Sequence, residues 1–318
     1  MREYGGYIEF EYFSGREYHA DAIALNSGRH CVEYLIKAKN IRKIYMPYFL
    51  CDSVFLVCQR LGVTVEYYHI DINFDPVFDK TPGDGEWVYV VNFYGQLSCA
   101  RLEKLKEKYK NIIVDNVQAF FDKPLPGVDT CYTCRKFFGV ADGGYLYTDV
   151  RLSEELERDQ SHGRMEFLFG RAERTASEFY SQYVKNNDIF ESEPLKRMSK
   201  TTQNLMRGID YERIKQVRTQ NFSLMHEKLG AVNKLKLSVP EGAFMYPLYI
   251  ENGAEIRKKL QEKKIYIPTL WPNVFELCRE GELEHDMAKN ILPLPIDQRY
   301  GKEDINEIIN AVLCIVKK

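Results

Sequence analysis

The sequence has no long hydrophobic run, no excess of charge of either sign and no glycine-rich nucleotide motif. No apolar segment approaches the roughly 20 residues that cross a bilayer, so a membrane partner is not expected. The 44 basic residues nearly balance the 46 acidic ones, and a net charge of −2 gives no reason to expect a nucleic-acid partner. Neither G-x-G-x-x-G nor G-x-x-x-x-G-K-[ST] occurs, so dinucleotide-binding and P-loop sites lack support.

The sequence also lacks an apolar N-terminal stretch and a complete set of zinc ligands. Without such a stretch, no secretory signal is expected. The cysteines are scattered in apolar surroundings (Cys31, Cys58, Cys314), which is typical of reduced, buried thiols and predicts a cytoplasmic protein. Cys131 and Cys134 have the C-x-x-C spacing of zinc and redox sites. No second close pair of cysteine or histidine accompanies them, so no metal is expected.

What the sequence does contain is an alternation of short apolar runs and helical stretches between residues 22 and 150. The apolar runs predict strands at 43–46, 63–68, 87–91, 112–114 and 144–148. The stretches between them predict helices at 31–39, 52–61 and 101–109. Continuous apolar runs are typical of strands buried on both faces. Together they predict an α/β fold with a mostly parallel sheet.

Beyond residue 150 the pattern changes to that of a smaller α+β domain. Charged helical sequence covers 153–185, and a long amphipathic helix is expected at 211–229. A strand-like segment at 243–250 and helices at 254–263 and 302–316 follow. Residues 186–206 show no clear periodicity and are predicted to form a loop or lid. The expected divisions are an N-terminal segment (1–20), a large domain (21–205) and a small C-terminal domain (206–318).

Two residues are the strongest candidates for chemistry. Lys136 precedes Phe137 and Phe138, which predict a partly buried lysine whose desolvated amine could attack a ligand. The alternative is a solvated surface charge, with a plain turn at 142–144. Asp115 ends the apolar run 112–114, and ligands in open α/β sheets sit at such strand ends. Its alternative is an ordinary helix N-cap.

Other candidates surround this pair in the sequence. Ser27, Gly28 and Arg29 open a predicted helix, where backbone N–H groups and the helix dipole attract an anion, although the same residues suit plain N-capping. Thr133, three residues before Lys136, could give its hydroxyl group to a phosphate. Further candidates end interior strands: Tyr48 and Phe49, which could stack on a flat ring or pack in the core, and Asn92, which points to the same sheet edge.

Taken in order, these segments resemble the cofactor-binding half of fold-type I pyridoxal 5′-phosphate (PLP) enzymes. Among these enzymes, the sequence most resembles the sugar aminotransferases of the DegT/StrS family. The matching segments are 25–29, 47–49, 92–96, 115–118 and 135–136, with 292–297 and 303–305 at the C-terminal end. The resemblance implies the fold-type I architecture, in which helices flank a mostly parallel sheet in a large PLP-binding domain and a smaller α+β domain follows.

The resemblance implies a role for each matching residue. Lys136 would form the Schiff base with PLP and move the proton, while Asp115 would pair with the pyridinium nitrogen. Gln118 would hydrogen-bond the cofactor hydroxyl. The remaining residues would surround the phosphate (Ser27, Gly28, Arg29, Thr133), cover the ring face (Tyr48 or Phe49) or replace a histidine that is common in the family (Asn92).

The implied activity is an aminotransferase that moves an amino group from an amino-acid donor, glutamate, to a keto sugar that is nucleotide-linked. The resemblance further implies cell-surface polysaccharide biosynthesis, small-molecule partners and a cytoplasmic homodimer. Relatives that replace the lysine with histidine are dehydratases, and Lys136 argues against that branch. Two departures from the family are Cys51, where an aromatic residue is usual, and the poorly matching residues 150–230.

Two other functions stay open at this point. A PLP-dependent lyase or desulfurase would need a reactive thiol on a mobile loop, for which Cys278 is the candidate, although residues 275–280 look helical. A noncatalytic relative would bind PLP or a sugar nucleotide as a regulator or assembly partner. Sulfide release and half-reactions with amine donors distinguish these alternatives from transamination.

Overall fold

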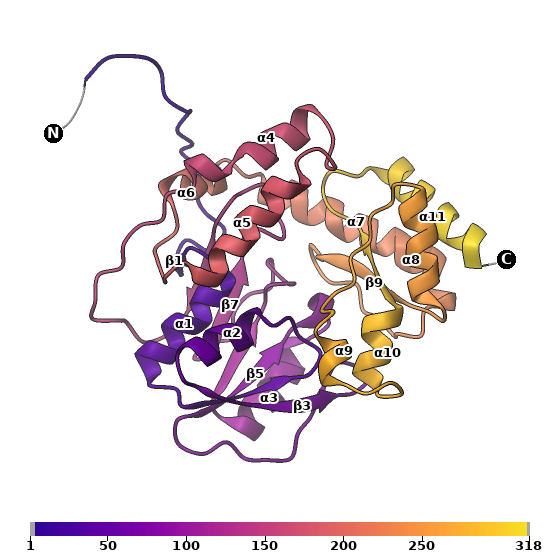
Figure 1. Ribbon diagram of the computed structural model, residues 1–318, viewed down its shortest axis with the longest axis horizontal. Coiled ribbons are helices and arrows are strands. Elements are labelled where there is room, and N and C mark those ends of the chain that lie inside the picture. Colours follow the sequence, from indigo (N-terminus) through magenta and orange to yellow (C-terminus); the bar gives the residue numbers. More distant parts are fainter. Residues whose placement is uncertain (1–3, 317–318) are drawn as a thin grey trace.

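An eight-stranded sheet forms the centre of the larger part of the molecule, in a computed structural model that describes residues 4–316 (Figure 1). The strand order is β1-β8-β7-β6-β5-β2-β3-β4. The strands are β1 (Ile23–Leu25), β2 (Lys43–Pro47), β3 (Thr64–Ile70), β4 (Pro76–Val77), β5 (Glu86–Val91), β6 (Ile112–Asp115), β7 (Asp129–Thr133) and β8 (Gly144–Tyr147). The five strands from β7 to β3 are parallel, which confirms the expected sheet, whereas β1, β8 and β4 pair antiparallel.

Helices cover both faces of this sheet. Successive residues of β5, Val88, Tyr89 and Val90, are all buried, as they must be in a strand with packing on both sides. Three flanking helices lie close to their predicted positions: α1 (Gly28–Lys39), α2 (Ser53–Arg60) and α3 (Cys99–Tyr109). The sequence did not indicate β1, β4 or β7.

Residues 150–210 differ from the expectation. The predicted helix over 153–185 is broken, since α-helices occur there only at α4 (Glu166–Glu173) and in the first part of α5 (Tyr180–Ser192). The predicted loop at 186–206 is wrong as well, because this range contains the C-terminal half of α5 and nearly all of α6 (Lys200–Arg207). On α5 only Asn186 and Phe190 are buried, so the helix has almost no apolar stripe to detect.

A second, smaller core follows. The antiparallel pair β9 (Met245–Tyr249) and β10 (Ile291–Pro295) packs with α7 (Tyr211–Leu229), α8 (Gly253–Glu262) and α11 (Lys302–Val316). Helices α7 and α11 have the predicted bounds. Two prolines concealed β10, which pairs only with β9 and therefore needs few ladder donors. Two short helices, α9 (Val274–Leu277) and α10 (Leu283–Asn290), return to the first core through Val274 and Met287.

The topology brings the candidate residues to one edge. Because β5, β6 and β7 are parallel neighbours, the residues that follow them meet at the same end of the sheet. The N-terminus of α1 reaches this end through β1 and β8, where a Cβ atom at Gly144 would lie 2.6 Å from the Ser27 carbonyl carbon. Gly143 adopts φ +119°, which only glycine tolerates without strain. Within residues 4–316, no helix is long and apolar enough to cross a membrane.

Candidate active site

Asp115 ends β6 as a fully enclosed carboxylate. Its Oδ1 accepts a hydrogen bond from the Val117 N–H and its Oδ2 accepts one from the Tyr89 hydroxyl, each at 2.8 Å. Burial raises the pKa of Asp115, while the positive charge of Lys136 and the two hydrogen bonds oppose the rise. The N-cap interpretation is wrong, because no helix begins here. Instead, Asp115 Oδ1 forms an Asx turn by accepting the N–H of Val117, two residues further on. A buried carboxylate of this kind is suited to a cationic partner.

Lys136 follows β7 and lies close enough to Asp115 for its charge to act on that carboxylate. The Phe137 and Phe138 N–H groups both bond to the Cys134 carbonyl, and this turn buries both rings. Lys136 itself is exposed, so the expectation of a partly buried lysine is wrong. Its Nζ lies 5.5 Å from the centre of the Phe244 ring. The site therefore places an accessible amine within electrostatic reach of a buried carboxylate.

The start of α1 is a tightly enclosed cup. Ser27 is the N-cap, and its Oγ accepts the His30 N–H at 3.4 Å. A Cβ atom at Gly28 would lie 3.3 Å from Val117 Cγ1 and 3.5 Å from Thr133 Cβ. A side chain at residue 28 would thus occupy the space between α1 and the ends of β6 and β7. Glycine keeps the backbone there open to a ligand.

Arg29 and Thr133 lie beside this cup. Among residues 4–316, the Arg29 side chain forms neither a hydrogen bond nor an ion pair, and its burial lowers its pKa. Thr133 is buried, and its hydroxyl group donates to the Gly143 carbonyl at 3.4 Å. The structure therefore brings Thr133 to the start of α1, which carries Arg29. The Thr133 hydroxyl group, however, already has an acceptor.

Asn92 follows β5 and organises the adjacent loop. Its Nδ2 donates to Asn116 Oδ1 at 3.1 Å and to Asp122 Oδ2 at 2.8 Å. Its Oδ1 accepts the Leu97 N–H at 2.9 Å. Since both ends of this buried amide have partners in the chain, Asn92 is placed to position the loop rather than to reach a ligand directly.

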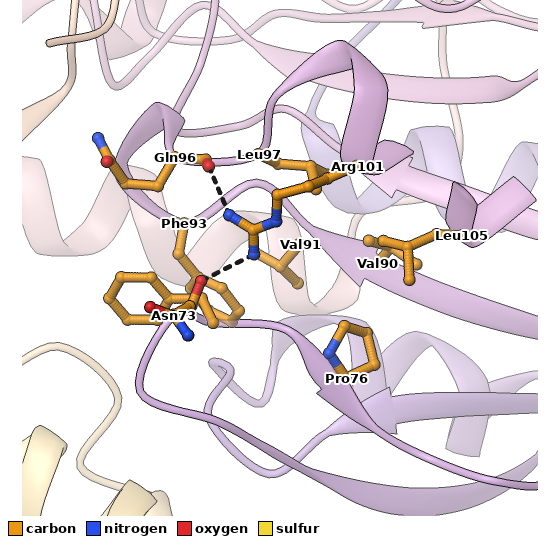
Figure 2. A pocket seen from close by; sticks show the side chains of 10 residues that line it. Asn73, Pro76, Val90, Val91, Phe93, Gln96, Leu97, Arg101 and Leu105 are labelled. Carbon is orange, nitrogen blue, oxygen red and sulfur yellow. Dashed lines mark hydrogen bonds between the residues drawn. The ribbon is translucent and has the colours of Figure 1, made fainter. Parts of the chain in front are cut away.

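Gln118 belongs to the same loop network. Its Oε1 accepts the N–H of Tyr94, a buried residue in the left-handed conformation (φ 54°). The turn is fixed from behind by Arg101 of α3, whose guanidinium group donates to the carbonyls of Gln96 at 3.0 Å and Asn73 at 2.9 Å (Figure 2). This rigid turn sets the position from which Gln118 could meet a ligand.

Two hollows in the structure lie away from Lys136 and Asp115. The cavity in Figure 2, between β5 and the Arg101 contacts, has a volume of about 10 Å³, enough for about one water molecule. A larger hollow of about 400 Å³ lies beside β1 and is lined in part by Ala24, Arg158 and Arg197. Neither is lined by Lys136 or Asp115, so neither is the candidate site.

Both aromatic candidates for the ring face have other neighbours. Tyr48 stacks on Tyr67 with ring centres 5.1 Å apart. Phe49 is buried edge-on to Trp271, 4.6 Å away. The role of either ring against a cofactor stays a prediction.

Sequence reasoning missed two residues. Tyr89 lay within an apolar run, and nothing in that run distinguished its hydroxyl group. Arg135 was visible as a second charge inside a buried stretch, and it donates to Asn187 Oδ1 and lies 4.5 Å from the centre of the Phe190 ring. Burial lowers the pKa of Arg135 to about 10, and the positive charges of Arg29 and Arg164 add to the effect.

The cysteines differ from the expectation of buried thiols at two positions. Cys99 on α3 and Cys314 on α11 are exposed, so the prediction is wrong there, because both helices have an outer face. Cys131 and Cys134 are buried, and burial raises the pKa of both thiols. Cys278 follows α9 in the first core, and burial raises its pKa to about 12. A reactive thiol on a mobile loop, which a desulfurase needs, is therefore not found at Cys278.

Comparisons with known proteins identify the fold. No protein family model matches the sequence, and the curated proteins give no match. Among solved structures, DesV of S. venezuelae in complex with a ketimine intermediate superposes with a TM-score of 0.65 at 16% identity, over 93% of this chain and 85% of DesV. NtdA of Bacillus subtilis, with bound cofactor PMP, gives 0.66 at 14% identity, over 93% and 73%.

A third structure, the sugar aminotransferase CalS13 of Micromonospora echinospora, gives a TM-score of 0.60 at 12% identity over 92% of this chain and 87% of CalS13. These likenesses show that the chain has the fold of the sugar aminotransferases. The fold expected from the sequence resemblance is thereby confirmed. At such identities a fold is shared, but an activity does not follow from the fold alone.

Proposed function

We propose that the chain is a PLP-dependent aminotransferase acting on a keto sugar. One observation carries the proposal: the accessible amine of Lys136 and the buried carboxylate of Asp115 lie at the ends of neighbouring parallel strands, in a sugar-aminotransferase fold. The other observations fit PLP. The Gly28 cup suits a phosphate group, and Asp115 suits a ring nitrogen that carries a proton.

When bound, PLP would supply an electron sink for a carbanion next to nitrogen. The residues of this chain would bind and orient it. Lys136 would hold the cofactor through its amine and then move a proton at the substrate carbon. Asp115 would keep the ring nitrogen protonated, and Tyr89 would help to keep Asp115 charged. Gln118 would meet the ring hydroxyl from its fixed turn.

The finer features of the proposal rest on the resemblance. The amino donor would be glutamate and the acceptor a nucleotide-linked keto sugar, in a cytoplasmic enzyme of cell-surface polysaccharide biosynthesis. A homodimer would cover the open side of the site, where Lys136 is exposed in the single chain. The proposed division into 1–20, 21–205 and 206–318 is supported by the separate core that α7, α8 and α11 form with β9 and β10.

The test is an absorbance spectrum of the purified protein with PLP, followed by borohydride reduction and peptide mapping. We expect a visible band, trapped on the peptide that carries Lys136, and its bleaching by glutamate. Lys136→Ala should abolish the band, whereas Lys258→Ala, on an exposed residue of α8, should keep it. Full turnover in Lys136→Ala would refute the mechanism.

The same preparation separates the alternatives. Release of sulfide from cysteine would indicate a desulfurase, against the burial of Cys278. A bound cofactor that reacts with no amine donor would indicate a noncatalytic relative. Bleaching by glutamate, with recovery of the band after a keto sugar is added, would exclude both.

A further inference from the structure

Two guanidinium groups near the start of α1 have no carboxylate partner. Arg29 and Arg135 are both largely enclosed, and burial lowers the pKa of each. Within residues 4–316, neither arginine forms an ion pair. In this range the Arg29 side chain forms no hydrogen bond, and the Arg135 side chain forms one, to the neutral amide of Asn187. Enclosed positive charge without a counter-charge is costly, and its presence points to an anionic ligand.

A third arginine nearby provides the contrast. Arg164 and Arg135 both lie against the Phe190 ring of α5, at 5.2 Å and 4.5 Å from its centre. Arg164, however, donates to Asp159 Oδ2 at 2.6 Å and is thereby neutralised. The chain therefore supplies a carboxylate where it needs a structural ion pair and supplies none to Arg29 or Arg135.

The acidic groups that face this pair do not neutralise it. Glu191 and Asp52 act on Arg29, and Asp142 acts on Arg135, but none lies within 4.0 Å as an ion pair. Asp142 is committed elsewhere, since it accepts the Ser199 N–H at 2.7 Å and the Ser199 hydroxyl at 2.8 Å. Neither arginine therefore has a carboxylate in direct contact.

The hydroxyl proton of Ser27 is not available to an anion. His30 Nε2 lies 3.0 Å from the Glu193 carbonyl, which only accepts, so Nε2 carries the ring proton. Burial lowers the pKa of His30 to about 4, so the ring is neutral near pH 7 and Nδ1 has a free lone pair. Ser27 Oγ, 2.9 Å from Nδ1, must then donate its proton to it.

The groups that can still bind an anion beside α1 are the two guanidinium groups and the first backbone N–H groups of the helix. The Thr133 hydroxyl donates to the Gly143 carbonyl. The N–H groups of Gly28 and Arg29 have no helical acceptor, because the first N–H groups of a helix never do. Together with the helix dipole, two guanidinium groups give a charge of roughly +2.5, which a phosphate monoester dianion balances and a single carboxylate does not.

We propose that Arg29 and Arg135, with the first N–H groups of α1, hold the phosphate group of the cofactor, and that the hydroxyl groups of Ser27 and Thr133 do not donate to it. This inference rests on the proposed function. Guanidinium forks match phosphate oxygens in pairs, so the two arginines determine the preference for the phosphorylated cofactor.

The test compares PLP with pyridoxal, which lacks the phosphate, by absorbance titration. The ratio of their affinities should fall at least about tenfold in Arg29→Gln and in Arg135→Gln, because each loses a charge-assisted contact. Pyridoxal binding itself should change little. Thr133→Val, which replaces the hydroxyl group with a methyl group of similar size, should alter the ratio less than about threefold. Should Arg135→Gln fail to fold, Arg29→Gln remains informative, since its side chain has no hydrogen bond to lose.

Two further results decide between explanations. An unchanged ratio in both arginine variants, or a loss as large in Thr133→Val, would overturn the inference. So would weaker glutamate binding with an unchanged ratio, which would assign the arginines to the donor carboxylate. If the wild type forms no band with PLP or pyridoxal, the proposed function fails. Inorganic phosphate then tests the pocket alone: it should raise the melting temperature of the wild type but not of either arginine variant.

Discussion

The hydroxyl group of Tyr89 on β5 donates a hydrogen bond of 2.8 Å to Oδ2 of Asp115 on the neighbouring strand β6. The two residues are buried, so no solvent competes for this contact. Burial favours the neutral form of Asp115 and raises its pKa, whereas the Tyr89 hydrogen bond favours the charged form. The charge of the residue proposed to hold the ring nitrogen thus depends on a second strand.

Tyr89→Phe should weaken PLP binding by about tenfold at low pH, because loss of a hydrogen bond to a charged group raises the pKa of Asp115 further. The defect should shrink as the pH rises, since Asp115 ionises in both proteins. Absorbance titrations from pH 6 to 8 measure this. Tyr68→Phe is the control: its hydroxyl donates to the Tyr89 carbonyl at 2.7 Å, so it loses a buried hydrogen bond but leaves Asp115 unchanged. A defect independent of pH would contradict the argument.

Asp122→Asn should stabilise the cofactor-free protein at pH 7.5. Burial raises the pKa of Asp122 to about 6, so the folded state binds its proton more tightly than the unfolded state does. That stability is present below the unfolded pKa near 4 and is lost as the pH rises through 6, at a cost of about 2–3 kcal/mol. Urea unfolding at pH 4 and pH 7.5 should show the variant gaining only at the higher pH. Asp79→Asn, on an exposed residue, is the control.

Gly144→Ala should cost about 2–4 kcal/mol of unfolding free energy and should also weaken PLP binding. The new Cβ atom would lie 2.6 Å from the Ser27 carbonyl carbon and 2.9 Å from the Gly28 nitrogen, so α1 must move away from β8. Gly163→Ala meets nothing within 4 Å and should change stability by less than about 1 kcal/mol. Equal stability of the two variants by urea unfolding would show that α1 tolerates the displacement.

Iodoacetamide should label Cys99 and Cys314 in the native protein but leave Cys278 unmodified. The first two thiols are exposed, whereas Cys278 is buried in the first core with a pKa raised to about 12, so almost no thiolate forms. Mass spectrometry of tryptic peptides gives the extent at each site, with urea-unfolded protein as the fully labelled reference. Rapid native labelling of Cys278 would reopen the desulfurase alternative.

The parts of the fold that the sequence predicted are those with a strong period. Helix α7 buries Ile214, Phe222 and Leu229 on one face, and its bounds were predicted correctly. Helix α5 buries only two residues, so its C-terminal half was predicted to be a loop. Strand β7 is entirely buried but contains Asp129, Thr130 and Thr133, and polar residues in such a strand carry no periodic signal.

For the site, the sequence indicated positions but not hydrogen-bond partners. Asp115 and Lys136 could be placed at one sheet edge because parallel strands align their ends. The hydroxyl donor to Asp115 lies on another strand, 26 residues away, and only the folded geometry shows it. Lys136 was expected to share the burial of its neighbours, but a turn directs it outward.

The cup at the start of α1 exists only when three distant segments meet. The Asn26 carbonyl accepts the Gly143 N–H at 2.7 Å, and the Asn26 N–H donates to the Lys196 carbonyl at 3.0 Å. During synthesis, a chain that has emerged only through β7 already carries Asp115 but cannot close this cup. Cofactor capture would therefore be a late event in biogenesis, and it would report that the chain has assembled well past its midpoint.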